Sequence, residues 1–291
     1  MKSIVYFTKE VGSDAVLKIY KKLGIELKGN VAVKVHSGEP GNQNFFHAEY
    51  FKPIVDYVDG TIVECNTAYS GERDTTEAHL KTLKDHGFIG NFKVDLMDKD
   101  PNKDIEIDIK DGFQIKKNYL GESIKNYDSL LVVSHFKGHP MGGFGGALKQ
   151  LSIGCASKYG KKNIHGAGNT SDNYFETDHD KFLISMADAA YSVCKLFDGK
   201  CAFINVMKNL SVDCDCCSVA EDPCMKDIGT LASLDPIAID QACIDLIYNS
   251  KDPGRDHFVE RVESRHGLLT LEYAEKHHFG SRQYELVDID E

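Results

Sequence analysis

Short apolar, β-branched segments alternate with amphipathic segments along this chain, and that alternation is what most constrains its fold. The predicted strands cover residues 3–7, 31–36, 60–66, 93–97, 104–109, 130–134, 202–206 and 228–232. The predicted helices cover residues 13–23, 45–58, 74–86, 143–153, 180–197, 236–249, 256–265 and 270–277. Such alternation predicts a layered α/β fold with a largely parallel or mixed central sheet and helices on both faces. We expect a single α/β domain over residues 1–291; two lobes around a cleft, the second within about 155–291, are the alternative.

Local signals refine this prediction at a few positions. Ser13 is expected to cap the first helix, and Asp235 followed by Pro236 predicts another helix start. The run DIEIDIK at 104–110 alternates apolar and charged residues, which favours a strand or hairpin with one exposed face. The run Lys158–Lys162 is expected to be a solvated turn.

Composition and charge narrow the class of protein. Hydrophobic residues make up 42% of the 291 residues, which is ample for a core. No apolar run reaches the roughly 18 residues that a membrane helix needs, and the opening MKSIVYFTKEVGSD resembles a strand more than a signal peptide. The net charge of −11 disfavours binding to nucleic acids or anionic membranes. We therefore expect a soluble, cytoplasmic protein that binds neither nucleic acid nor membrane.

Three basic side chains follow the predicted strand at 130–134. His135, Lys137 and His139 alternate along the chain, so in an extended backbone they would share one face. The unperturbed pKa of histidine, about 6.5, suits proton transfer at neutral pH. We predict these three residues to be catalytic; the alternative is that the histidines only bond to nearby carbonyl groups.

Four glycines come directly after this basic trio, at Gly142, Gly143, Gly145 and Gly146. A glycine-rich segment that leads into a helix can offer backbone N–H groups to an anion, so these residues are predicted to bind substrate or cofactor. The segment matches neither a dinucleotide-binding fingerprint nor a P-loop, and it does not identify a cofactor. Packing of the helix against the sheet is the alternative role.

Cysteines are concentrated late in the chain. The sequence has nine cysteines, an odd number that favours reduced thiols or ligands over disulfides. Thiolates suit iron–sulfur clusters, zinc or copper, but the spacing here is neither that of a zinc ribbon nor that of a ferredoxin. Metal or cluster binding is therefore predicted only from the number of cysteines in a short stretch of sequence. The alternative is a reduced, cysteine-rich surface loop. The four clustered residues are Cys214, Cys216, Cys217 and Cys224.

Polar side chains also follow the two early strands. His36 comes after the strand at 31–36, and Arg73 and Thr75 follow the strand at 60–66. Ligands of open parallel sheets gather beyond the carboxyl ends of the strands. We predict that Arg73 grips a carboxylate or phosphate, with His36 and Thr75 beside it. The alternative is ordinary helix capping with a solvated arginine.

Several long motifs in one order resemble the family called domain of unknown function 362, which is described as ferredoxin-associated or as iron–sulfur-centre proteins. The motifs lie at 72–88, 134–161, 213–216 and 227–247. The resemblance implies roles for Cys155, Cys214 and Cys216 in binding an iron–sulfur cluster. Many members similar to this chain carry a two-cluster ferredoxin insert, whereas residues 160–180 contain no cysteine here.

One segment, HPMGGFGGALKQLSIG at 139–154, is similar to the glycine-rich histidine segment of the lactate racemase family, which uses a nickel-pincer nucleotide. This likeness implies that His135 or His139 handles the proton or metal. It also implies that Lys137 or Lys149 contacts the cofactor and that Arg73 binds the substrate carboxylate.

Three functions follow from these motifs. The first is a cytoplasmic redox enzyme that uses an iron–sulfur cluster or another soft metal ion and acts on a small anionic substrate. The second is a racemase or epimerase with a nickel or organic cofactor. The third is a non-catalytic metal or cluster carrier that docks with a ferredoxin. The first requires the basic trio at 135–139 and the cysteine loop to meet in one pocket, whereas for the second the histidine pair and not the cysteines is decisive.

Overall fold

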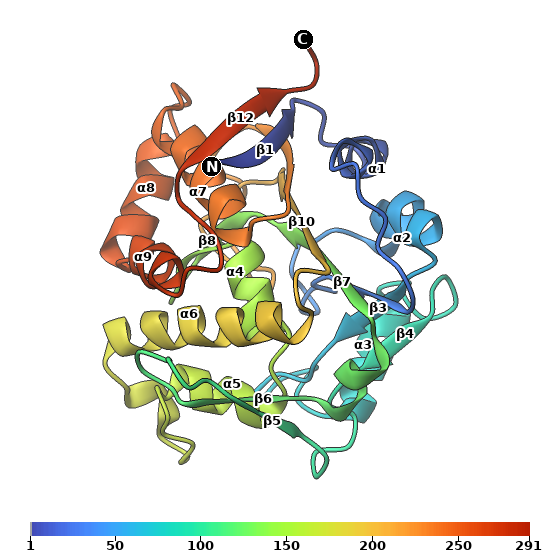
Figure 1. The fold of residues 1–291 in the computed structure, drawn as a ribbon, viewed down its shortest axis with the longest axis vertical. Helices are drawn as coiled ribbons and strands as arrows, with labels where there is room; N and C mark the ends of the chain where they lie inside the picture. The colour runs from blue at the N-terminus through green and yellow to red at the C-terminus, as the bar shows by residue number, and fades with distance from the viewer. Residues whose placement is uncertain (1) are drawn as a thin grey trace.

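The computed structural model describes residues 2–291 and is built on an eight-stranded sheet in the order β12-β1-β11-β10-β7-β2-β3-β4 (Figure 1). The strands are β1 (Ser3–Thr8), β2 (Val31–Lys34), β3 (Thr61–Glu64), β4 (Val94–Leu96), β7 (Ser129–His135), β10 (Cys201–Met207), β11 (Gly229–Ser233) and β12 (Tyr284–Asp288). All neighbouring strands are parallel except at β11, which runs antiparallel to both β1 and β10. The mixed sheet that the sequence predicts is confirmed.

Helices cover both faces of this sheet. Along β7, Leu130 and Val132 enter one hydrophobic core while Leu131 and Val133 enter the other, as the twofold repeat of a strand requires. In Figure 1, α1 and α2 lie on one side of the sheet, and α4, α6, α7, α8 and α9 lie on the other. The helices are α1 (Ser13–Lys22), α2 (Lys52–Val58), α3 (Thr76–Asp85), α4 (Ala147–Lys149), α5 (Lys158–His165), α6 (His179–Leu196), α7 (Pro236–Tyr248), α8 (Arg255–Ser264) and α9 (Leu268–Lys276).

Two hairpins stand outside the main sheet. Strand β5 (Ile105–Asp108) pairs antiparallel with β6 (Lys117–Leu120), and its exposure alternates along the strand, so the expected half-exposed hairpin is confirmed. Strand β8 (Lys137–His139) pairs antiparallel with β9 (Gly143–Gly145). The second hairpin corrects the prediction of a helix over 143–153. That segment instead forms β9, the single turn α4 and a π-helical turn at Gln150–Gly154, a geometry often found at functional sites.

Helix boundaries differ from the prediction at three further places. The helix expected at 45–58 begins only at Lys52 after a 3₁₀ turn at Ala48–Phe51. Gly12, not Ser13, is the N-cap of α1. The turn expected at Lys158–Lys162 is the start of α5, because the Ser157 side chain accepts a hydrogen bond from the Gly160 N–H.

The cap at Asp235 is confirmed, since its Oδ1 accepts from the N–H groups of Ile237 and Ala238 and Pro236 takes the first helical position. No helix within residues 2–291 is long and apolar enough to span a bilayer. The division into one domain or two lobes stays a prediction.

Candidate metal and anion site

The site residues meet where the sheet changes its direction of winding. Strands β2 and β7 are neighbours in the sheet. The chain leaves β2 toward β3, near one edge of the sheet, and leaves β7 toward β10, in the direction of the other edge, so the two connections diverge. Such a switch point leaves a crevice beyond the carboxyl ends of the strands. The loops that follow β2, β3, β7 and β10 all reach this crevice.

A cavity of about 180 Å³ occupies the crevice. Its wall carries three buried cationic side chains that form ion pairs with carboxylates, two further lysines, several histidines and Cys216. The main polar lining residues are Lys34, His36, Glu64, Arg73, His135, Lys137, His139, Lys149, Lys161 and His165. Lys34 and Lys137 are among the buried residues, and long charged side chains are almost never fully buried unless they are paired or functional.

The basic trio and the cysteine loop meet through Asp215. The Asp215 carboxylate lies 2.9 Å from His135 Nδ1 and accepts a bond of 2.8 Å from Lys137 Nζ. Burial opposes the ionisation of Asp215, but the charges of His135 and Lys137 hold its pKa well below the usual range. The other ring nitrogen of His135 lies 2.6 Å from the Lys208 carbonyl oxygen. Both ring nitrogens of His135 therefore face protein acceptors, and this histidine fixes the loop in place.

His139 lies beside the thiols of the same loop. Its Nδ1 accepts from the backbone N–H groups of Met141 (3.1 Å) and Gly142 (2.8 Å), and its Nε2 lies 3.8 Å from Cys216 Sγ. The ligand atoms of His139, Cys214 and Cys216 all lie within 4.8 Å of one another, so this group could hold a metal ion. Burial lowers the pKa of His139 to about 4, so its imidazole is neutral at pH 7.

The thiols of the loop have unequal acidity. Burial raises the pKa of Cys214 to about 11, and the pKa of Cys216 is also raised. A hydrogen bond with Cys216 lowers the pKa of the half-buried Cys217. Lys149 Nζ lies 3.8 Å from Cys214 Sγ. Burial opposes the charge of Lys149, but the neighbouring sulfur atoms raise its pKa, so it remains an ammonium.

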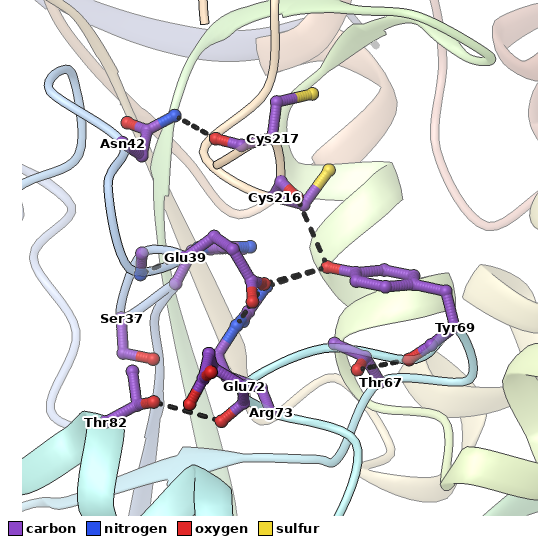
Figure 2. Close-up of polar contacts among 12 residues, drawn as sticks. Ser37, Glu39, Asn42, Thr67, Tyr69, Glu72, Arg73, Thr82, Cys216 and Cys217 are labelled. Carbon is purple, nitrogen blue, oxygen red and sulfur yellow. Dashed lines mark hydrogen bonds and ion pairs between the residues drawn. The ribbon is translucent and has the colours of Figure 1, made fainter. Parts of the chain in front are cut away.

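The loops after β2 and β3 hold the cysteine loop from a second side (Figure 2). Asn42 donates a hydrogen bond of 2.8 Å to the Cys217 carbonyl oxygen. The Tyr69 hydroxyl lies 3.4 Å from the Cys216 carbonyl oxygen. The Tyr69 hydroxyl also accepts a hydrogen bond from Arg73 Nη2 and lies 3.2 Å from Glu39 Oε2. Arg73 Nε and Nη2 each lie 2.8 Å from the same Glu39 oxygen. Arg73 is thus buried against a carboxylate of its own chain and is not solvated.

Two close approaches shape the basic and glycine-rich segment. A Cβ on Gly138 would lie 2.3 Å from the Val212 carbonyl oxygen, so only glycine lets β8 pack on the cysteine loop here. Asp240 of α7 accepts from the N–H groups of Ala147 and Leu148, and a Cβ on Gly146 would strike its carboxylate at 2.3 Å. The first N–H groups of α4 therefore bind Asp240 and not a ligand.

The other predicted residues fall in different places. His36, Gly145, Gly146 and Lys149 line the cavity, whereas Gly143 packs on Gly267 of the α8–α9 connection.

Several predicted residues lie apart from the thiol group. Thr75 caps α3 and lines a separate surface hollow with Asn66 and Asp98. Cys155 is buried beside Cys65 in the core. Cys224 bonds to the Leu210 carbonyl oxygen. Neither of these two cysteines belongs to the group at His139.

Sequence reasoning missed four side chains of the cavity. Lys34 forms an ion pair with Glu64 at 2.9 Å. Its position inside the apolar run VAVKVH could have identified it, because a charged residue is unusual in a buried strand. Lys161 and His165 lie on the helix that was expected to be a loop, so no pattern pointed to them.

Comparisons with known proteins place the chain in a family without assigning an activity. A lactate racemase apoprotein from Thermoanaerobacterium thermosaccharolyticum is 16% identical over 71% of this chain and 51% of its own, with a TM-score of 0.41. A protein from Thermotoga maritima is 10% identical over 91% of this chain and 58% of its own, with a TM-score of 0.43. The chain thus spans a little over half the length of these structures. No curated protein matches it.

The match to a protein family covers most of the chain. The family described as "Domain of unknown function (DUF362)" matches residues 31–245, which include the basic trio, the glycine-rich segment and the cysteine loop. The chain belongs to the DUF362 family.

Proposed function

We propose that this protein is a metal-dependent enzyme of redox type that acts on a small anionic substrate, with a soft metal ion held by Cys214 and Cys216. The observation that carries the proposal is the shared cavity. Cys216 and His139 line the same cavity as Lys149, Lys161 and Arg73, so a metal at the thiols would face an anion held by cations.

The two thiols suit a soft metal ion. Sulfur ligands select zinc, copper(I) or iron. Because the pKa values of both thiols are raised, metal binding must displace their protons, and affinity should rise with pH.

His139 is less suited than the two thiols to bind the metal, because of the hydrogen bonds that its ring already makes. Its Nδ1 accepts two backbone N–H groups, so the ring proton sits on Nε2 and points at Cys216. Ligation through Nε2 would require these backbone contacts to be given up. In the structure as it stands, His139 positions Cys216 by hydrogen bonding.

A mononuclear ion is favoured over a four-cysteine cluster. Within the described part of the chain, only Cys214 and Cys216 converge with a histidine, while Cys155 and Cys224 lie elsewhere. Cubane clusters are normally held by four cysteines. When bound, the metal would supply Lewis acidity or electron transfer, and the cavity cations would bind and orient the substrate.

The decisive experiment is elemental analysis with an optical spectrum on anaerobically purified protein. We expect close to one equivalent of a transition metal in the wild type and its loss in Cys214→Ser and Cys216→Ser. Cys155→Ala and Cys224→Ser are the matched controls and should keep the metal. Metal-free wild type that turns over a substrate, or equal metal loss in the controls, would contradict the proposal.

A racemase or epimerase is the second candidate, and the neutral histidines of the cavity favour it. Burial keeps the pKa of His36 well below its usual value and lowers that of His165 to about 3. A neutral imidazole beside a bound anion has a free nitrogen for a proton, although a pKa of about 3 makes His165 a weak base before the anion binds. If activity survives Cys214→Ser and Cys216→Ser but is lost in His165→Gln, this candidate replaces the first. Docking to a ferredoxin stays a third proposal, tested by binding without turnover.

A further inference from the structure

We infer that the cavity is built for a small dianion, a dicarboxylate or a phosphate monoester, whose two negative charges are matched by Lys149 and Lys161. The inference rests on the proposed function, since it concerns the same cavity, and it specifies the substrate class.

The charges that line the cavity do not cancel. Five cationic side chains face it, and three of these are neutralised by buried carboxylates of the chain itself (Figure 2 shows one pair). The three pairs are Lys34 with Glu64 at 2.9 Å, Arg73 with Glu39 at 2.8 Å and Lys137 with Asp215 at 2.8 Å. Two ammonium groups remain.

Lys149 and Lys161 have no carboxylate oxygen within 4.0 Å among residues 2–291. Lys149 Nζ lies 3.8 Å from Cys214 Sγ. If Cys214 and Cys216 bound a divalent metal ion, the two negative charges of their thiolates would balance the charge of the metal. The charge of Lys149 would then remain unbalanced. Lys161 Nζ donates to the Ala156 carbonyl oxygen at 2.6 Å. Burial lowers the pKa of Lys161, although the more distant carboxylates of Asp98 and Glu64 act in the opposite direction.

Burial lowers the pKa values of His36 and His165, so neither adds a charge at pH 7, and His135 shares the Asp215 carboxylate with Lys137. The ammonium groups of Lys149 and Lys161 therefore contribute about +2 that no carboxylate pairs directly. Burying an uncompensated charge is costly, and an anion of matching charge would remove that cost.

His165 supplies an independent sign of a missing ligand. Its ring lines the cavity and stacks on Phe182 with centroids 4.7 Å apart. Its Nδ1 is buried and has no hydrogen-bond partner within the described residues. The ring lines the same cavity as Lys149 and Lys161. Buried polar atoms are rarely left unpaired in native proteins, and this one belongs to a ring that lines the cavity.

The size of the cavity agrees with the charge. A cavity of about 180 Å³ has room for several waters. A small organic acid with two acidic groups fits that space.

Calorimetric titration at pH 7 tests the inference on the protein as purified and again after metal removal. Malonate and succinate represent dicarboxylates, methyl phosphate represents phosphate monoesters, and acetate is the monoanion control. We expect at least one dianion to bind tenfold or more tightly than acetate. Equal binding of acetate and all dianions, or no binding of any, would overturn the inference, and this series needs no variant to fold.

Variants locate the binding charges. Lys149→Met and Lys161→Met should each weaken dianion binding about ten- to hundredfold, the usual worth of a charged hydrogen bond. Lys162→Met is the matched control, because Lys162 is the next residue of α5 and lies near Asp172 and Tyr174 outside the cavity. An equal loss in Lys162→Met would overturn the assignment. Dianion binding by metal-free protein would support it even if the metal proposal fails.

Discussion

Gly138→Ala should push the cysteine loop away from the basic trio. The new Cβ would lie 2.3 Å from the Val212 carbonyl oxygen and 2.5 Å from its carbon, against 3.4 Å or more for an ordinary contact. The loop must therefore move by about 1 Å. A shift of that size would stretch the bonds of Asp215 to His135 and Lys137, now 2.9 and 2.8 Å, beyond hydrogen-bond range.

The expected cost is about 1–3 kcal/mol from overpacking alone, and more if the buried Asp215 charge loses its partners. Urea unfolding measures this loss. A thiol reagent applied under native conditions measures the displacement, because Cys214 is only 1% exposed and should react faster in the variant.

Gly12→Ala is the control for this experiment, since nothing lies within 4 Å of a Cβ at that position. Its cost should stay below about 1 kcal/mol. If Gly138→Ala is as stable as Gly12→Ala and Cys214 reacts no faster, the close packing of β8 on the cysteine loop is wrong.

Two further predictions concern the buried charges. Asp215→Asn should destabilise the protein by about 3–5 kcal/mol in urea unfolding, because His135 and Lys137 would lose their counter-ion; a loss below about 1 kcal/mol would contradict the buried triad. The folded-state pKa values of Asp215 and Glu64 lie below those of an unfolded chain, so their stabilisation is present above about pH 4 and lost as the pH falls further. The urea midpoint should therefore drop between pH 5 and pH 3 in the wild type and drop less in Asp215→Asn.

The layered sheet could be predicted because its central strands are apolar on both faces. The run at 130–134 feeds two cores, and an alternation of strands and helices rarely supports another architecture. The helix predicted over residues 143–153 is wrong at its N-terminal end, where Gly143–Gly145 form β9. Its hairpin depends on Gly138 packing against Val212, a contact between segments far apart in the chain that local sequence does not encode.

The meeting of the basic trio with the cysteine loop could be predicted from residue chemistry, but its detail could not. Asp215 lies between two cysteines of the sequence, and no local pattern indicates that its carboxylate pairs with His135 and Lys137. His165 gave no sequence signal, because its position depends on how α5 packs against the cavity. Pairing of buried charges is a property of the assembled fold.

X-ray absorption spectroscopy of zinc-loaded protein tests the central claim most directly, because it reports the atoms bound to the metal. We expect two sulfur scatterers at about 2.3 Å in the wild type, the distance of a zinc–thiolate bond. Cys216→Ser should retain one of these sulfurs, and Cys155→Ala should retain both. A shell of nitrogen and oxygen alone in the wild type would contradict metal binding by Cys214 and Cys216.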